Sequence, residues 1–280
     1  MDKNILKFYL YCFSSMIIVS ILAPGLFVNI NNNADYIITK LTLPSKNEHH
    51  EVITVSKNKG NIIIMMDDGF KSQYTVGYKY MNKKSMRGSI AVITNFIGRP
   101  GYLNEAQLYR LHNDGWDLLN HTHNHKNLRT LSYQEQLDEI NESSKWLEKK
   151  GYGINNNILI YPYGSFNEDT IKILKEFDFI GARGITDGFN NKTPDNPYNI
   201  KVKNVLSNIE PQTVYKWIDY TQENNLTLIL LFHKLEPITD SSLMQYEENK
   251  FYEIIDYVDK KREKLNIITF SQWLRIINNK

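Results

Sequence analysis

Eight short apolar runs, separated by segments with helical periodicity, limit the folds open to this chain more than any other feature of its sequence. The runs are continuous rather than alternating, which is typical of strands buried on both faces of a parallel sheet. The predicted strands cover residues 61–66, 89–94, 116–120, 157–161, 179–183, 200–206, 226–232 and 266–269. Because strands alternate with helical segments along the chain, we predict an α/β fold, a distorted (β/α)7-8 barrel.

Five helical segments lie between or after these strands. The clearest covers residues 132–150, where Ser132 and Glu135 form a capping box and Leu137, Ile140 and Leu147 mark one apolar face. The other predicted helices cover residues 104–112, 167–177, 211–223 and 246–264. In a barrel of this kind the chemistry takes place at the carboxyl ends of the strands, so polar residues directly after each run are the candidates for a site.

The overall composition excludes some classes of partner. The 280 residues are enough for one domain with a full core, and their formal net charge is +2. That charge is too small and too evenly spread for a nucleic-acid-binding face, so we expect no nucleic-acid partner. The single cysteine, Cys12, lies near the N-terminus, so a metal site in the rest of the chain must use His, Asp or Glu.

The first thirty residues differ from the rest. Lys3 and Lys7 precede an apolar run over residues 8–28, which predicts either an export signal or a membrane anchor formed by residues 5–28. The sequence does not decide between cleavage and anchoring, and a buried core helix is a less favoured alternative. Residues 31–59 are predicted to form a linker with one short strand at 36–41, and residues 60–280 are predicted to form the folded domain.

Ionisable side chains gather after three of the predicted strands. Asp67 and Asp68 follow the first strand, His121 and His125 follow the third, and His233 follows residues 226–232. A spacing of four puts two imidazoles on one side of a helical turn, and two imidazoles with one carboxylate are a common zinc ligand set. Two adjacent carboxylates are costly unless one is neutralised. If Asp68 binds the metal, Asp67 is free to act as a base and His233 as an acid, but the residues alone do not assign these roles.

These residues and their order resemble the polysaccharide deacetylase family with the NodB-type catalytic domain, also called carbohydrate esterase family 4. The resemblance covers about residues 61–269 and implies a barrel of the polysaccharide deacetylase type. Four family motifs appear as Met65-Met66-Asp67-Asp68-Gly69, His121-Thr122-His123-Asn124-His125, Ile160-Tyr161-Pro162-Tyr163-Gly164 and Leu231-Phe232-His233.

The resemblance implies a role for each matching residue. Asp67 would be the base, His233 the acid, and the backbone N–H of Tyr163 the donor to the oxyanion. The implied metal ligands are Asp68, His121 and His125, with Zn²⁺ as the favoured divalent ion, and the implied substrate-binding residues are Pro162 and Leu231.

Two departures from the family pattern concern the orientation of the catalytic groups. The third motif lacks its usual arginine, which orients the base, and we predict that Arg183 in Gly181-Ala182-Arg183-Gly184 replaces it. The fourth motif, an aspartate with a downstream tryptophan, has no clear counterpart. Asp187 lies nearby without a suitable tryptophan, so the residue that orients His233 is unassigned.

The implied activity is metal-dependent hydrolysis of N-acetyl groups from an N-acetylglucosamine-containing polysaccharide, with release of acetate. An exported or anchored enzyme, acting as a monomer, fits a bacterial cell-surface glycan such as peptidoglycan, a chitin-like polymer or poly-N-acetylglucosamine. The alternatives are removal of O-acetyl groups, hydrolysis of another amide or ester, and a catalytically silent glycan-binding protein.

Overall fold

The computed structural model describes residues 50–239, 241 and 243–278, together with four short strands between residues 12 and 42, and it describes side chains from Val55 onward. The chain divides into two units, Met1–Asn58 and Lys59–Asn278. The second unit contains all the predicted site residues.

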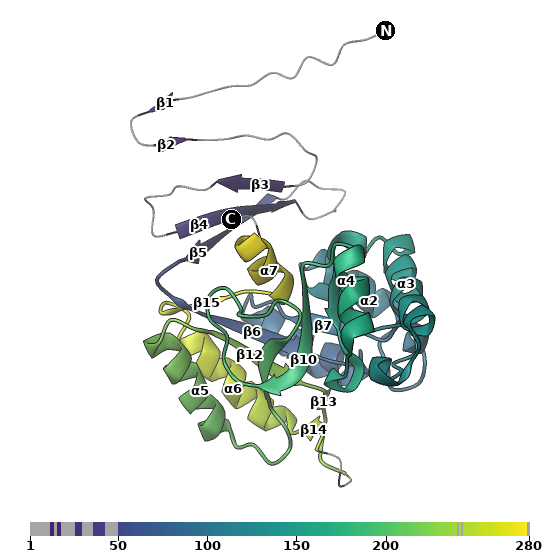
Figure 1. Cartoon of the computed structure of the whole chain (residues 1–280). Helices are drawn as coiled ribbons and strands as arrows, with labels where there is room; N and C mark the ends of the chain where they lie inside the picture. Colours follow the sequence, from purple (N-terminus) through teal and green to yellow (C-terminus); the bar gives the residue numbers. More distant parts are fainter. Residues whose placement is uncertain are drawn as a thin grey trace. The chain divides into compact units, whose positions relative to one another are not determined.

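The second unit is a closed barrel of parallel strands (Figure 1). Its seven strands are β6 (Gly60–Met66), β7 (Ser89–Val92), β8 (Asp117–Asn120), β9 (Ile158–Ile160), β10 (Gly181–Asp187), β11 (Ile200–Asn204) and β12 (Thr227–Phe232). Each pairs with the next, and β12 pairs with β6 from Thr227↔Asn61 to Phe232↔Met66, which closes the ring. The predicted (β/α) barrel is therefore confirmed.

The eighth predicted strand, β15 (Leu265–Ile267), is not a separate member of the ring. It pairs with Gly60–Ile62, whereas β7 pairs with β6 only at Met65 and Met66. Because β12 occupies the other edge of β6, β15 and β7 share one edge, which distorts the barrel.

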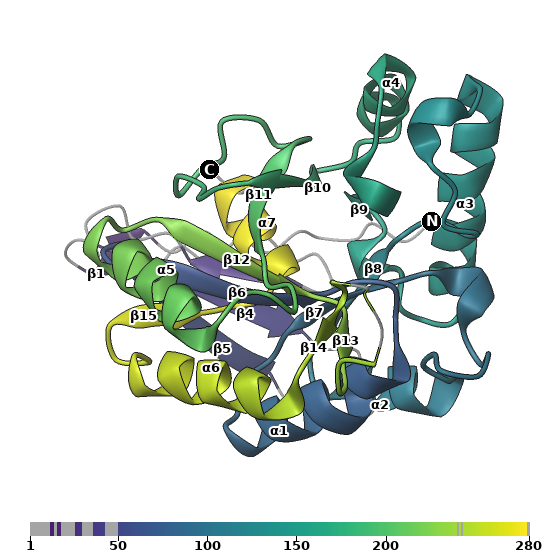
Figure 2. The ribbon, with the colours of Figure 1, turned by 90° about the horizontal axis from the view of Figure 1, so that it is seen from below.

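Helices surround the barrel on its outer side (Figure 2). The five predicted helices are present as α2 (Glu105–Asn113), α3 (Tyr133–Lys149), α4 (Glu168–Glu176), α5 (Pro211–Glu223) and α6 (Glu248–Lys260). The structure adds the π-helical turn η1 (Gln73–Tyr78), α1 (Lys79–Lys83) and α7 (Phe270–Asn278), which the sequence analysis did not predict. The predicted capping box of α3 is formed by Ser132 and Glu135.

Short elements connect these helices and strands. They are the 3-10 turns η2 (Thr94–Phe96), η3 (Leu128–Thr130), η4 (Gly153–Asn155) and η5 (Pro162–Gly164), and the paired strands β13 (Lys234–Leu235) and β14 (Gln245–Tyr246).

The alternation of side chains along the strands determines which residues enter the barrel. The outward-facing residues pack in the core against the helices, among them Ile62, Ile64, Met66, Leu228, Leu230 and Phe232. The alternate residues on the same strands, Ile63, Met65, Ile229 and Leu231, are fully buried outside that cluster and face inward. The residues that follow, Asp67 after β6 and His233 after β12, continue the inward rows and so reach the mouth of the barrel.

The first unit contains two small antiparallel sheets. One pairs β1 (Cys12–Phe13) with β2 (Met16–Ile17), and the other orders β3 (Leu26–Asn29), β4 (Tyr36–Thr42) and β5 (His50–Ser56). The strand expected at 36–41 corresponds to β4, and β5 adds a second strand to the segment interpreted as a linker. The proposed signal or anchor lies mostly outside the described residues and stays a prediction. Within the described part of the chain, no helix is long and apolar enough to cross a membrane.

Candidate active site and metal centre

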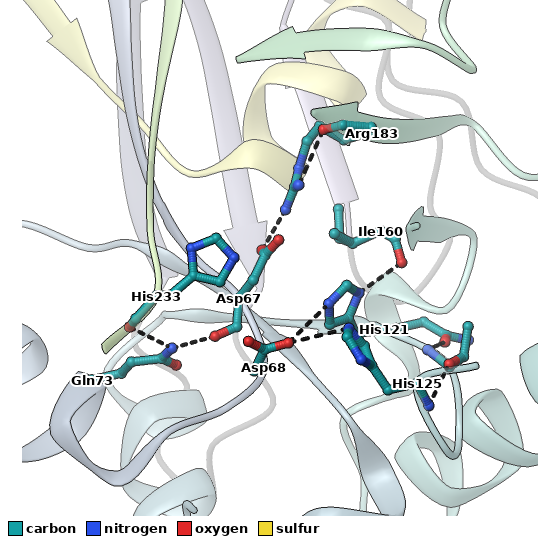
Figure 3. Close-up of polar contacts among 11 residues, drawn as sticks. Asp67, Asp68, Gln73, His121, His125, Ile160, Arg183 and His233 are labelled. Atoms are coloured by element: carbon teal, nitrogen blue, oxygen red, sulfur yellow. Dashed lines mark hydrogen bonds and ion pairs between the residues drawn. The ribbon is translucent and has the colours of Figure 1, made fainter. Parts of the chain in front are cut away.

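Asp68, His121 and His125 meet at the mouth of the barrel (Figure 3). Asp68 Oδ1 lies 3.4 Å from His121 Nε2 and 3.3 Å from His125 Nε2. Metal–ligand bonds of about 2.0–2.1 Å around a tetrahedral zinc ion would separate neighbouring ligand atoms by about 3.3–3.4 Å. Among the described residues this is the one trio of such side chains close enough to hold a metal ion. The predicted ligands therefore come together, and the two distances from Asp68 match those around a tetrahedral ion, for which three protein ligands would leave a fourth position to water or substrate.

The backbone of β9 orients the His121 ring. His121 Nδ1 lies 2.8 Å from the carbonyl oxygen of Ile160. A carbonyl oxygen can only accept, so Nδ1 carries a proton and Nε2 faces Asp68. A second hydrogen bond of this kind is what fixes a metal-binding imidazole in place.

The pKa values of the two histidines differ in the metal-free protein. Burial disfavours the charged form of His121, but its hydrogen bond to Asp68 and the charges of Asp67 and Asp68 outweigh burial and raise its pKa. Burial and the nearby His121 lower the pKa of His125 to about 4. Burial would raise the pKa of Asp68, but the three neighbouring histidines lower it overall. One proton on His121 therefore compensates the Asp68 carboxylate, and a metal ion would take the place of that proton.

The predicted helical turn between His121 and His125 is wrong, although the two rings do meet. Residues 121–125 form an irregular loop in which Thr122 has a φ of 63° and His125 a φ of 59°, both left-handed. Thr122 Oγ1 accepts a hydrogen bond from His125 N at 3.1 Å, which closes the loop. The ring centroids lie 4.8 Å apart as a result of this loop closure rather than of helical periodicity.

Helix α3 supports this loop through a buried carboxylate that the sequence analysis missed. Glu139 accepts hydrogen bonds from Asn124 N at 2.7 Å and from Asn124 Nδ2 at 2.8 Å. Its backbone oxygen accepts from His123 N at 3.0 Å. An acidic residue beside Ile140 on the buried face of α3 was the available signal. Residues 123 and 124, between the two candidate ligands, are therefore fixed to α3.

The second aspartate, Asp67, has a separate partner. Arg183 Nη2 donates to Asp67 Oδ1, and the Arg183 side chain is 0% exposed. Arg183 pairs in register with Ile160 on the neighbouring strand, and Ile160 occupies the place where the family motif has its arginine. The predicted replacement thus lies one strand away at the same level of the barrel, in contact with Asp67 (Figure 3).

His233 lies beside Asp67 because Phe232 and Met66, the residues before them, are paired. Burial lowers the pKa of His233, and within the described residues its Nδ1 has no hydrogen-bond partner. Asp187 does not supply one, since it pairs with Lys203 Nζ at 2.6 Å. The residue that would orient His233 thus stays unassigned.

The remaining predicted residues surround the same site. Tyr163 has a left-handed φ of 58° in the turn that starts at Pro162, and its ring centroid lies 4.6 Å from that of His125. The Tyr163 side chain is 60% exposed, whereas Pro162 and Leu231 are buried. Leu231 lies on the same face of β12 as His233. Their roles toward a substrate stay predictions.

Three comparisons with known proteins agree with this arrangement. Residues 54–181 match the family model described as polysaccharide deacetylase. A putative polysaccharide deacetylase, YxkH, from Bacillus subtilis is 31% identical over 111 residues, which cover 40% of this chain and 39% of that protein. A poly-beta-1,6-N-acetyl-D-glucosamine N-deacetylase from Staphylococcus epidermidis is 29% identical over 185 residues, 59% of this chain and 61% of that protein.

A solved structure of a putative polysaccharide deacetylase from Mycobacterium smegmatis has the same fold. It superimposes with a TM-score of 0.60 at 11% identity and covers 79% of this chain and 91% of that one. The chain is thus similar to the polysaccharide deacetylase family over residues 54–181, and it shares the barrel fold of this solved structure over 79% of its length.

Proposed function

We propose that this protein is a metal-dependent hydrolase that removes N-acetyl groups from an N-acetylglucosamine-containing polysaccharide and releases acetate. The observation that carries the proposal is the division of partners between two adjacent aspartates. Asp68 faces His121 and His125, whereas Asp67 is paired with Arg183. This division leaves one carboxylate for a metal ion and holds the other as a base.

A divalent ion held by Asp68, His121 and His125, with Zn²⁺ favoured by the ligand set, would polarise the acetyl carbonyl and acidify a water molecule. Asp67 would take a proton from the water molecule as the water oxygen attacks the carbonyl carbon. The backbone N–H of Tyr163 would donate to the oxyanion that forms. His233 would give a proton to the nitrogen as the C–N bond breaks, which leaves acetate and a free amine.

The sequence, the match to the family model and one named relative support the substrate class. The relative from Staphylococcus epidermidis is named as acting on poly-beta-1,6-N-acetyl-D-glucosamine, and the apolar segment over residues 5–28 supports export, with release or anchoring at a bacterial cell surface. A cell-surface glycan is therefore the proposed substrate, with the N-acetyl amide preferred over an O-acetyl ester.

A catalytically silent glycan-binding protein is the second candidate. It is favoured by one observation: in the described part of the chain the buried Nδ1 of His233 has no hydrogen-bond partner. An acid that lacks an orienting group is poorly placed to donate. The intact Asp67–Arg183 pair argues for the enzyme, since binding alone does not need a buried, paired base.

The two candidates are separated by measuring acetate release from N-acetylglucosamine oligomers, both β-1,4- and β-1,6-linked, with protein reconstituted with Zn²⁺ and with protein treated with a chelator. The enzyme should release acetate from at least one oligomer, lose this activity with chelator and regain it with metal. Binding of an oligomer without release by metal-loaded protein would favour the silent homologue.

A further inference from the structure

Gln73 connects the two strand ends that carry the proposed base and acid. It is fully buried at the start of η1, and its Nε2 donates to the backbone oxygens of both Asp67 and His233, the latter at 3.0 Å (Figure 3). A residue from a third segment of the chain thus contacts the backbone of both catalytic candidates.

These contacts extend the hydrogen-bond ladder between β6 and β12. The last backbone bond between the two strands runs from Asp67 N to Phe232 O at 3.0 Å. Beyond it, the carbonyls of Asp67 and His233 are each bonded to the Gln73 amide. Since buried carbonyl groups need a donor, the amide serves as a final rung between the strands.

The chemistry of the partners identifies which end of the amide faces them. Both partners are carbonyl oxygens and can only accept, so the NH₂ group must point at them. Among the described residues the buried Gln73 oxygen has no hydrogen-bond partner, which costs about 1–3 kcal/mol for a polar group. A leucine would avoid that cost but could not bridge the carbonyls, so the bridging contacts account for the glutamine.

The segment before Gln73 is also fixed to the strand end that carries His233. Ser72 Oγ accepts a hydrogen bond from Leu235 N at 3.0 Å. Residues 72 and 73 therefore hold the carbonyl of His233 and the amide of Leu235, two residues further on, which limits the freedom of His233 to move away from Asp67.

We propose that Gln73 is a positioning residue that sets the spacing between Asp67 and His233. The proposal rests on the function proposed above, in which the two side chains act on opposite parts of one amide. Amide hydrolysis needs both the base and the acid, whereas hydrolysis of an aryl acetate needs only the base, because a nitrophenolate leaves without being protonated. Loss of the correct spacing should therefore affect the amide reaction more than the ester reaction.

The test compares wild type and Gln73→Leu on an N-acetylglucosamine oligomer and on 4-nitrophenyl acetate, both with Zn²⁺-loaded protein. We expect kcat on the oligomer to fall on the order of 10- to 100-fold, as for small misplacements of reacting groups, with a smaller loss on the ester and with unchanged zinc affinity. If the leucine variant does not fold, Gln73→Asn applies the same test, since its shorter amide cannot reach both carbonyls.

Gln136 provides a matched control. It is also fully buried, and its Nε2 donates to Leu131 O at 3.1 Å and to Asn167 Oδ1 at 3.2 Å, away from the site. The Gln136 oxygen also accepts from Thr170 Oγ1, so Gln136→Leu should lower stability at least as much while keeping the wild-type ratio of amide to ester activity. An unchanged ratio in the Gln73 variant, or an equal change in the Gln136 variant, would overturn the proposal.

A second measurement separates this proposal from the proposed function. The His233 ring signal in histidine-labelled NMR spectra, assigned with His233→Asn, should shift in Gln73→Leu and not in Gln136→Leu. If wild type releases no acetate but the signal shifts, the proposed function fails and the positioning role stands. If the signal does not move, the positioning role fails.

Discussion

Replacing Arg183 with methionine should destabilise the metal-free protein by about 3–5 kcal/mol, the usual cost of leaving one buried charge of an ion pair without its partner. The Asp67 side chain is only 4% exposed in the pair, so water cannot replace the guanidinium. Methionine keeps part of the apolar volume, which limits the contribution of a cavity. A domain with a total stability of roughly 5–15 kcal/mol can lose this much and still fold.

A double-mutant cycle with Asp67→Asn isolates the ion pair from other losses. Arg183 Nη1 also donates to Gly184 O at 3.1 Å, and the loss of that bond, about 1 kcal/mol, occurs with or without Asp67 and cancels. The double variant should therefore be more stable than the sum of the single effects predicts, by more than about 1 kcal/mol. Urea unfolding in the presence of chelator measures all four proteins without the stabilisation that a bound metal would add.

Arg275 is the matched control. Its Nη2 donates to two neutral acceptors, Ile154 O and Asn155 Oδ1, so Arg275→Met should cost less and should add to Asp67→Asn without coupling. In acetate release, Arg183→Met should lose at least about 100-fold in kcat/KM because the base is no longer held in place. Additive stability effects of Arg183→Met and Asp67→Asn would refute the reasoning.

Three further outcomes are expected. At about pH 6, near the usual histidine pKa, Zn²⁺ binding should release one proton from His121, whose pKa is raised, and none from His125, whose pKa is about 4. Zinc affinity should therefore fall as the pH falls. Calorimetry in two buffers with different heats of ionisation counts the released protons. Asp67→Asn should keep its metal content but lose about 10²–10⁴-fold in turnover, the usual contribution of a general base, and loss of metal instead would mean that the two aspartates have exchanged roles. Glu139→Gln should weaken zinc binding about 10-fold, as for other residues that support a ligand, whereas Glu135→Gln at the exposed start of α3 should leave the affinity unchanged.

The barrel was predictable because strands buried on both faces have continuous apolar sequences. The candidate metal ligands Asp68, His121 and His125 were found because they follow such strands and match two motifs of the resembled family. The conformation of the loop between His121 and His125 was not predictable, because a spacing of four suits a helix as well as a loop that is closed by a threonine hydroxyl. Gln73 was not predicted because its partners are main-chain oxygens, which leave no pattern in the sequence. Glu139 was not predicted because its partner, Asn124, is 15 residues away in the sequence. The strand β15 showed the same apolar run as the others, and only the pairing with β6 shows that it lies outside the ring.

Residue 160 is isoleucine, whereas the motif of the resembled family has an arginine at this place. For contact with Asp67, the position of an arginine in the barrel therefore matters more than its place in the motif. Residue 160 supports the candidate ligand His121 through its carbonyl oxygen, which accepts from His121 Nδ1 whatever side chain is present. This contact does not depend on the side chain at 160, and it is Arg183 that contacts Asp67. Because Arg183 is paired with Ile160 on the adjacent strand and side chains at paired positions point to the same face of a sheet, an arginine there enters the barrel at the same level. In this chain one guanidinium thus reaches Asp67 at this level of the mouth, from the strand next to the one that carries Ile160.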